Sequence, residues 1–232
     1  MKTIGIIGGM GPMATVDLMQ KIILATDAQE DQEHIPILVD NNTRIPDRTA
    51  AILGAGPSPV PELLKSAQRL TAAGADFLIM GCNTAHYFLP EFEPELTVPL
   101  LNMVTLTAEY CQAQGLKKVA LLASAGTCRT GLYQKALAAV GVAVLQPEGA
   151  QEQAIHGMIY DGVKAGNPHY DAAPAQQVLR ELQAQGAEAF VLGCTEMPVA
   201  VAMYHLQGHF IDATQVLAEA SVRYAGAKVK HV

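Results

Sequence analysis

Two short stretches of this sequence place a cysteine directly after a glycine and before polar residues. They are Gly81-Cys82-Asn83-Thr84-Ala85-His86 and Gly193-Cys194-Thr195-Glu196. Each follows a short apolar run, which predicts that each lies at the C-terminal end of a buried strand. A thiol with an ordinary pKa of about 8.5 can become a thiolate, and a thiolate is a base. Two such groups on opposite faces of one carbon can remove a proton and return another, which inverts the configuration of that carbon.

Polar groups beside both cysteines could assist such a reaction. His86 and Glu196 follow their cysteines closely and could orient or tune the thiols, or else be surface residues at a helix start. The hydroxyl groups of Thr84 and Thr195, with the backbone N–H groups after each cysteine, could bind a carboxylate that gains enolate character. We therefore expect these residues to surround the reacting carbon.

Two cations are candidates for holding an acidic substrate. Arg48 lies in a segment rich in Asn, Gly and Pro, and Lys164 lies near the end of a predicted helix, one turn after Tyr160. The spacing between them is close to the spacing between the two cysteines. Because the net charge of the chain is −7, an anionic ligand would have to be held by a few local cations. The pair favours a dicarboxylate, with Tyr160 as a supporting residue.

A glycine-rich turn near the N-terminus permits a second class of function. Gly9-x-Gly11-x-x-Ala14 follows a predicted strand, precedes a helix, and has Asp40 after the next strand. The pattern is typical of dinucleotide-binding oxidoreductases, although Asp40 lies further along than the usual interval of about 20 residues. Alternatively, the turn uses free N–H groups to bind an anion such as a carboxylate. We favour the second interpretation.

The cysteines also raise the question of a metal or a disulfide framework. Cys82, His86 and Cys194 could bind zinc, but their spacing matches no established zinc motif, so we expect no metal. The four cysteines do not form a pattern typical of disulfide scaffolds. We interpret Cys111, and also Cys128 near a predicted helix start, as core residues.

Composition limits the remaining classes. The chain has 232 residues, of which 50% are hydrophobic and 16% charged, as in globular proteins. It has no basic cluster and no Trp, which argues against nucleic acid as a partner. It contains no apolar run long enough to cross a bilayer and no recognisable signal peptide. We expect a cytoplasmic protein with a small-molecule substrate and no membrane or nucleic-acid partner.

Strand and helix patterns alternate, and the alternation occurs twice. The predicted strands are residues 2–7, 35–39, 76–80, 98–101, 117–124, 142–145, 188–192 and 210–211. The predicted helices are residues 12–28, 61–73, 105–114, 130–140, 150–165, 174–185 and 214–225, and residues 40–61 are predicted to be a long loop. The pattern predicts an α/β fold of two similar, pseudo-symmetric domains, each a parallel sheet flanked by helices. Ligands of parallel sheets bind at the C-terminal strand ends, so we expect an active site in the cleft between the domains.

The sequence resembles the aspartate/glutamate racemase family, and its aspartate racemase branch in particular. The resemblance covers nearly the whole chain. It rests on Thr3-Ile4-Gly5-Ile6-Ile7-Gly8-Gly9-Met10-Gly11-Pro12, Ile45-Pro46-Asp47-Arg48-Thr49 and the two cysteine motifs. Both catalytic positions are Cys, whereas some relatives have Thr at one of them.

The resemblance implies racemisation by two cysteines without pyridoxal phosphate or any other cofactor, in a homodimer. By resemblance, Cys82 and Cys194 are the acid and base, and Arg48 and Lys164 hold the side-chain carboxylate. It assigns the α-carboxylate and amino group of the substrate to Asn83, Thr84, Thr195 and the Gly9–Met10 turn, with Thr127 as a further contact. It also implies that residues 1–103 and 214–232 form one domain and residues 104–213 the other.

Several alternatives stay open. Within the superfamily these are a broad-specificity amino-acid racemase, a hydantoin racemase and a maleate isomerase. Outside it they are the oxidoreductase and a non-catalytic protein that binds acidic amino acids. The sequence does not indicate which thiol is ionised at rest, or whether residues 40–60 close over the site.

Overall fold

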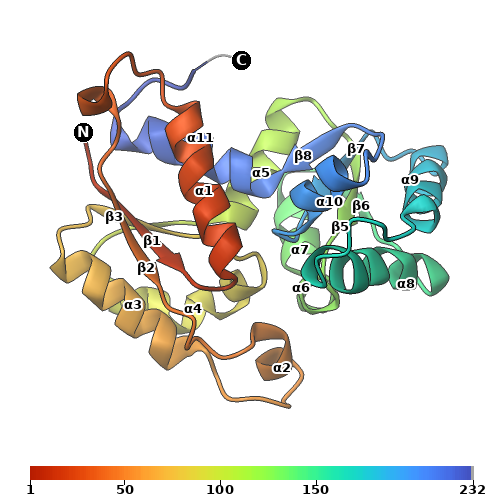
Figure 1. Ribbon diagram of the computed structural model, residues 1–232, viewed down its shortest axis with the longest axis horizontal. Coiled ribbons are helices and arrows are strands. Elements are labelled where there is room, and N and C mark those ends of the chain that lie inside the picture. Colours follow the sequence, from red (N-terminus) through yellow and green to blue (C-terminus); the bar gives the residue numbers. More distant parts are fainter. Residues whose placement is uncertain (231–232) are drawn as a thin grey trace. The chain divides into compact units, whose positions relative to one another are not determined.

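A computed structural model describes residues 1–230 of the chain. It contains two compact units, one formed by residues 1–106 and the segment from Thr214 onward, the other by residues 107–213 (Figure 1). The last two residues of the predicted range 214–232 lie outside the described residues. The C-terminal segment thus returns to the unit in which the chain begins.

The first unit is built on a four-stranded parallel sheet in the order β2-β1-β3-β4. Its strands are β1 (Ile4–Gly8), β2 (Ile37–Asn41), β3 (Phe77–Met80) and β4 (Leu100–Leu101). Every residue of β1 and β3 is buried, as expected for central strands covered by helices on both faces. Ile7 of β1 pairs with Met80 of β3, so the segments that follow these strands leave the same edge of the sheet.

Helices connect and cover the strands of this unit (Figure 1). They are α1 (Pro12–Ala25), α2 (Arg48–Ile52), α3 (Val60–Ala72), α4 (Leu89–Phe92) and α11 (Ala213–Ala225). The helix α5 (Met103–Ala113) begins in this unit and continues into the second. Short 3₁₀ helices lie at η1 (Asp31–Glu33), η2 (Thr84–Phe88) and η3 (Glu93–Glu95). The helix η2 begins directly after the first cysteine turn, and α2 packs against it.

The second unit repeats the strand order of the first. Its parallel sheet runs β6-β5-β7-β8, with β5 (Lys118–Leu122), β6 (Ala143–Leu145), β7 (Ala189–Leu192) and β8 (Phe210–Asp212). Its helices are α6 (Ala125–Thr130), α7 (Leu132–Ala139), α8 (Ala150–Gly157), η4 (Met158–Lys164), α9 (Ala173–Ala184) and α10 (Met197–Met203). In both sheets the first strand along the chain lies beside the second and third. The predicted α/β class with two similar parallel sheets is confirmed.

Three predicted segments differ from the structure. The long loop 40–61 contains α2, whose residues are all at least partly exposed, so it has no apolar periodicity to reveal it. The helix predicted over 130–140 begins at Leu132, and a separate helix that was not predicted, Ala125–Thr130, precedes it; Gly131, with φ of 66°, divides the two. The helix predicted over 150–165 continues beyond α8 as the π-helix η4, a segment that contains Gly162.

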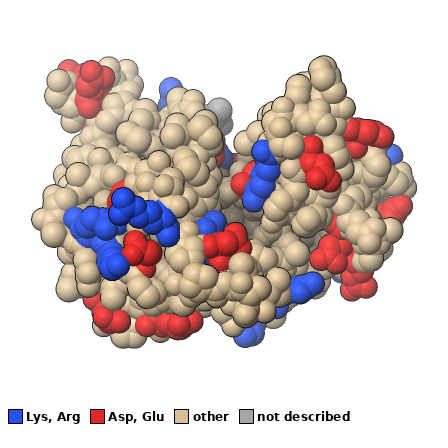
Figure 2. All heavy atoms as spheres, turned by 60° about the horizontal axis from the view of Figure 1, so that its bottom comes forward, with Lys and Arg blue, Asp and Glu red and all other residues tan. Residues whose placement is uncertain are grey.

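Charged side chains do not form an all-basic surface on the face shown in Figure 2. Lys and Arg side chains lie beside Asp and Glu side chains there, and wide areas carry neither. In the part of the chain that the structure describes, helices long and apolar enough to cross a membrane are absent.

Candidate active site

The turn after β1 is closed by the side chain of Thr15. Gly9 has φ of 89°, and a Cβ at this position would lie 2.3 Å from the carbonyl carbon of Asn42. The Gly9 N–H donates to Thr15 Oγ1 at 2.9 Å, and the Thr15 hydroxyl donates to the Gly11 carbonyl at 3.1 Å. Contrary to our expectation of free donors, the Gly9 N–H is therefore already used within the turn.

The acidic residue of the dinucleotide pattern is also engaged. Arg69 donates to Asp40 Oδ2 from Nε at 3.0 Å and from Nη2 at 2.6 Å. In a dinucleotide site, the carboxylate in this position accepts from a ribose hydroxyl and a glycine N–H approaches the pyrophosphate. Both Asp40 and Gly9 have protein partners here, which weakens the oxidoreductase interpretation.

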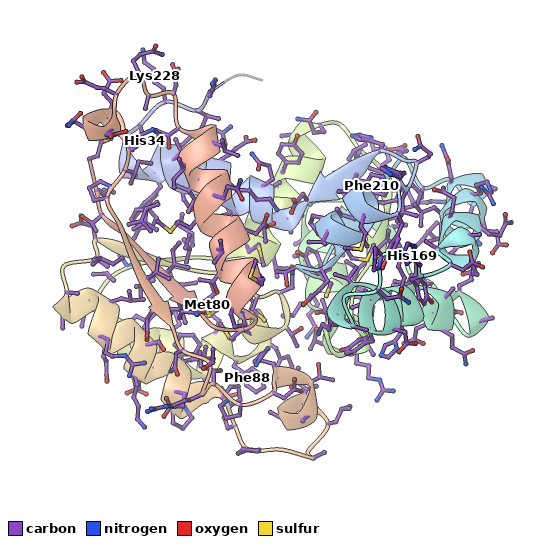
Figure 3. The ribbon with its side chains drawn as sticks, in the orientation of Figure 1. His34, Met80, Phe88, His169, Phe210 and Lys228 are labelled. Carbon is purple, nitrogen blue, oxygen red and sulfur yellow. The ribbon has the colours of Figure 1, made fainter. Side chains whose placement is uncertain are left out.

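The first cysteine turn follows β3. Figure 3 shows Met80 at the end of this strand and Phe88 further along the segment that follows. Cys82 is 6% exposed, and Asn83 and Thr84 are buried. Cys82 shares an apolar cluster with Met10 from the neighbouring turn. The first unit thus brings together the thiol, two of the predicted carboxylate contacts and the turn after β1.

His86 faces the backbone of this turn. Its Nδ1 lies 2.9 Å from the carbonyl oxygen of Cys82, and its Nε2 accepts from the Met103 N–H at 3.2 Å. A backbone N–H can only donate, so Nε2 is the unprotonated nitrogen and Nδ1–H donates to the carbonyl. Burial lowers the pKa of His86 to about 4, against the opposing effect of its backbone hydrogen bonds. His86 is therefore neutral at pH 7 and joins the cysteine turn to the start of α5.

Arg48 is held at the first residue of α2 by backbone carbonyl groups. Its Nη1 donates to Pro46 at 3.0 Å and to Ile45 at 3.4 Å, and its Nη2 donates to Met10 at 3.4 Å. Its Nε is buried and has no hydrogen-bond partner among the described residues. Asp47 caps the helix by accepting from the Ala50 N–H at 2.7 Å. The guanidinium group is thus fixed beside the turn after β1.

The second cysteine turn follows β7, which occupies the place of β3 in the repeated sheet. Cys194 is 8% exposed, and its Sγ donates to Glu196 Oε2 at 2.9 Å. The Thr195 hydroxyl donates to the same oxygen at 3.1 Å. Burial raises the pKa of the Cys194 thiol, and the Glu196 charge and its hydrogen bond raise it further. This thiol is a hydrogen-bond donor and is held in its protonated form.

Lys164 lies at the end of η4, close to Glu196. Its Nζ is 3.7 Å from Glu196 Oε1 and 4.5 Å from the centre of the Tyr160 ring. The helix η4 packs against α10, which begins directly after Glu196. Tyr160 packs against the same apolar cluster as Cys194. The predicted cation, its supporting aromatic residue and the second thiol therefore come together in the second unit.

Thr127 lies in α6, at the end of the strand adjacent to β7. It is completely buried, and its N–H donates to Ser124 Oγ, the helix cap, at 3.5 Å. The two hydroxyl groups are 3.3 Å apart. We had not selected Ser124 from the sequence, although a serine three residues before a polar residue at a helix start is a recognisable capping signal.

The other two cysteines have no activating neighbours. Burial raises the pKa of Cys111 to about 11, and burial and Glu152 raise the pKa of Cys128 to about 11. All four cysteines are unpaired. Groups of three or more His, Cys, Asp or Glu side chains placed to hold a metal ion are absent from residues 1–230. The Met103 N–H, which holds His86, lies outside every motif noted in the sequence.

Comparisons with known proteins identify the family of this chain. A model of the family described as Asp/Glu/hydantoin racemase matches residues 7–221. A broad-specificity amino-acid racemase, RacX of Bacillus subtilis, is 28% identical over 94% of this chain and 96% of its own length. The structure of Picrophilus torridus aspartate racemase has a TM-score of 0.83 and 33% identity, over 99% of this chain and 96% of that one. An aspartate racemase homologue from Pyrococcus horikoshii shares the fold, with a TM-score of 0.81 and 23% identity over 97% and 100% of the two chains.

Proposed function

The chain belongs to the Asp/Glu/hydantoin racemase family, and from this premise we propose that it interconverts L- and D-aspartate, with glutamate as the second candidate substrate. The observation that carries the proposal is the placement of one buried thiol after the third strand of each repeated sheet, Cys82 after β3 and Cys194 after β7. A single thiol can exchange a proton on one face of a carbon only. Two thiols, one from each unit, supply the base and the acid that inversion needs.

In the proposed mechanism the two thiols act on opposite faces of the substrate α-carbon. The thiolate of one cysteine takes the proton from the α-carbon, and the thiol of the other donates a proton to the opposite face. Asn83, Thr84 and Thr195 bind the α-carboxylate and amino group, where hydrogen bonds strengthen as enolate charge develops. Thr127 and the Gly9–Met10 turn complete these contacts. We propose, as the family resemblance implies, that the reaction uses no pyridoxal phosphate.

A substrate with a second carboxylate is supported by one cation in each unit. Arg48 presents a guanidinium group fixed by three carbonyl oxygens, and guanidinium groups bind carboxylates through paired hydrogen bonds. The Lys164 ammonium group carries three donors, so it can contact Glu196 and a substrate carboxylate together. The resemblance to an enzyme named aspartate racemase supports the same substrate.

A broader specificity is the second candidate function. The similarity to a broad-specificity racemase extends over nearly the whole chain, and 41% of the Lys164 side chain is accessible. An exposed ammonium group restricts the substrate less than a buried one. Alanine, which lacks the side-chain carboxylate, separates the two candidates, because the aspartate proposal requires it to be a poor substrate.

The deciding experiment is exchange of the α-hydrogen in deuterated water, followed by NMR and chiral chromatography. We expect L- and D-aspartate to exchange and racemise with the wild-type protein. Cys82→Ser and Cys194→Ser should each reduce racemisation by about 10²–10⁴-fold, the usual contribution of a general acid or base. Cys128→Ser is the control and should leave the rate unchanged. Full racemisation by either active-site variant would overturn the two-thiol mechanism, and binding without exchange would indicate a binding protein.

The assembly, the domain limits and the location are proposals of the same kind. We propose a homodimer on the basis of the family resemblance, which sedimentation equilibrium tests directly. Domains of residues 1–103 with 214–232, and of residues 104–213, can be tested by limited proteolysis. Four unpaired cysteines are in keeping with a reducing cytoplasm, and cell fractionation tests that location.

A further inference from the structure

Glu196 contacts three groups of the second half-site at once. Its Oε2 accepts from Cys194 Sγ at 2.9 Å and from the Thr195 hydroxyl at 3.1 Å. Its other oxygen, Oε1, lies 3.7 Å from Lys164 Nζ. A carboxylate that accepts a hydrogen bond from a thiol requires the thiol to keep its proton, because two anions this close repel one another.

The first half-site has no equivalent of this arrangement. The ionisable residue of that turn, His86, is bonded to the backbone through both ring nitrogens and is neutral. It therefore places no charge beside Cys82. The two thiols occupy corresponding positions in the repeat, yet only Cys194 has a carboxylate on its sulfur.

We propose that Glu196 is a positioning residue that holds Cys194 in the protonated form, so that in the resting enzyme Cys194 is the acid and Cys82 is the base. Lys164, close to the other oxygen of Glu196, weakens the effect of the Glu196 charge on the thiol. The proposal rests on the racemase function proposed above. It assigns Cys194 as the proton donor for the enantiomer that Cys82 deprotonates, a point on which the sequence motifs are silent; the other enantiomer needs the reverse protonation states.

The proton balance gives Glu196 a second consequence. One proton passes from the substrate α-carbon to Cys82, and another passes from Cys194 to the opposite face of that carbon. The thiolate charge thereby moves from Cys82 to Cys194, beside the Glu196 carboxylate. Repulsion between these two anions then favours uptake of a proton from water by Cys194 and loss of one from Cys82, which restores the resting state.

The charges around Cys194 allow a test of sign. Among the described residues, the charged groups that act on this thiol are Glu196, in the turn before α10, and Lys164, at the end of η4. Glu196 raises the pKa of the thiol and Lys164 lowers it. Glu196→Gln should therefore lower the pKa, and Lys164→Met should raise it. A residue that only supported the packing of the turn would not give opposite shifts.

The first experiment measures the alkylation of Cys194 by iodoacetamide as a function of pH, with the modified peptide quantified by mass spectrometry. The reactive species is the thiolate. We expect the midpoint to fall by about one pH unit or more in Glu196→Gln and to rise in Lys164→Met, the size usual for a neighbouring charge. Glu148→Gln and Lys135→Met, both at exposed positions of the same unit, are the matched controls. An unchanged midpoint in Glu196→Gln, or shifts in the same direction, would overturn the proposal.

The second experiment measures kcat/KM for aspartate across pH. In the free enzyme the upper limb reports loss of the acid proton, and the two thiols titrate as a coupled pair. We expect the upper limb of Glu196→Gln to move to lower pH and the lower limb to stay, with Glu196→Asp intermediate. A racemase whose upper limb is unmoved in Glu196→Gln would refute the role of Glu196 alone. A protein without racemase activity would refute the proposed function, while the alkylation experiment would still decide whether Glu196 holds the thiol proton.

Discussion

The turns after β3 and β7 have the same place in their sheets, but the ionisable residue beside the cysteine differs between them. In each, a glycine and a cysteine follow a buried strand. His86 faces the main chain and is neutral, whereas the carboxylate of Glu196 accepts a hydrogen bond from the sulfur of Cys194. Duplication of a fold thus preserves where a thiol lies without preserving what surrounds it. A reaction that needs one acid and one base is served by that difference.

The two cations differ in a similar way. Arg48 has a planar guanidinium group whose N–H groups donate to the carbonyl oxygens of Ile45, Pro46 and Met10. Lys164 is a point charge near a carboxylate and an aromatic ring. The first cation is therefore fixed in orientation and the second can change partners with little rearrangement.

The largest predicted effect concerns His86, which has no counterpart in the second turn. His86→Phe keeps an aromatic ring but removes both hydrogen bonds, so the Cys82 carbonyl and the Met103 N–H lose their bond to the ring. Each buried unsatisfied group costs about 1–3 kcal/mol, and we expect the free energy of unfolding to fall by about 2–5 kcal/mol in urea titrations. The control is His169→Phe at an exposed position, which should change stability little. A loss no larger than that of the control would contradict the bridging role of His86.

The same residue predicts a pH dependence. The pKa of His86 is lowered from 6.5 to about 4 in the folded protein, so between these values the unfolded chain binds more protons than the folded one. Stability therefore rises with pH across this window and is lost as pH falls from 6.5 towards 4. The wild type should lose roughly 3 kcal/mol more than His86→Phe over this range. Parallel pH profiles of the two proteins would contradict a buried, neutral His86.

The contrast between turns also marks what the sequence could predict. The central strands were predictable because β1, β3, β5 and β7 are short apolar runs that glycine or polar residues end. The helix α2 was not, because none of its residues is fully buried and five residues give no periodic signal. Gly131 was read as part of a helix, although its positive φ ends one. A single glycine within an apolar pattern does not reveal which conformation it adopts.

Side-chain direction was the other part that could not be predicted. His86 and Glu196 both follow a cysteine within four residues, and both could have contacted a thiol. The choice depends on partners distant in sequence: the Met103 N–H draws the His86 ring away from the sulfur, and Lys164 lies beside the Glu196 carboxylate. Such contacts arise from tertiary packing, which local patterns do not encode.

Exchanging the two types of cation tests the contrast between Arg48 and Lys164. Arg48→Lys replaces a planar guanidinium group that donates to three carbonyl oxygens by an ammonium group that cannot make the same contacts. We expect kcat/KM for aspartate to fall by about 10–100-fold, the loss of roughly 1.4–2.8 kcal/mol of transition-state binding. Lys164→Arg keeps the charge on a side chain that is 41% accessible and should cost less than about tenfold. Equal losses in the two variants would show that the halves hold the substrate in the same way.

The glycines before the two cysteines give a matched pair for stability. A Cβ at Gly193 would lie 2.7 Å from Leu121 Cδ1 and 3.1 Å from Ala123 Cβ, whereas a Cβ at Gly81 would lie 3.1 Å from Leu18 Cδ2. Overpacking of a core destabilises the folded protein by about 1–3 kcal/mol. Replacing glycine by alanine lowers the conformational entropy of the unfolded chain, which stabilises the folded protein by about 0.4–1 kcal/mol. Gly193→Ala should therefore lower the free energy of unfolding by about 1–2 kcal/mol, and Gly81→Ala should be close to neutral. The reverse order in thermal or urea unfolding would refute the difference in packing.

The smallest predicted effect compares the caps of the two short helices, α2 and α6. Asp47 accepts from the Ala50 N–H at 2.7 Å, and Ser124 accepts from the Thr127 N–H at 3.5 Å. Removing a cap costs about 1 kcal/mol of helix stability. The share of this loss that appears in the free energy of global unfolding depends on whether the helix has residues buried in the core. The helix α6 contains buried residues, whereas α2 contains none.

The better hydrogen bond should therefore have the smaller effect on global stability. Ser124→Ala should lower the free energy of unfolding by about 1 kcal/mol, because α6 cannot fray without exposing Thr127. Asp47→Ala should change global unfolding by only a few tenths of a kcal/mol, since α2 can open locally. Its effect should be faster amide exchange at Ala50 and a higher KM for aspartate, because Arg48 is the first residue of α2. Unchanged exchange at Ala50 in Asp47→Ala would mean that the carbonyl contacts of Arg48, rather than the cap, hold this helix in place.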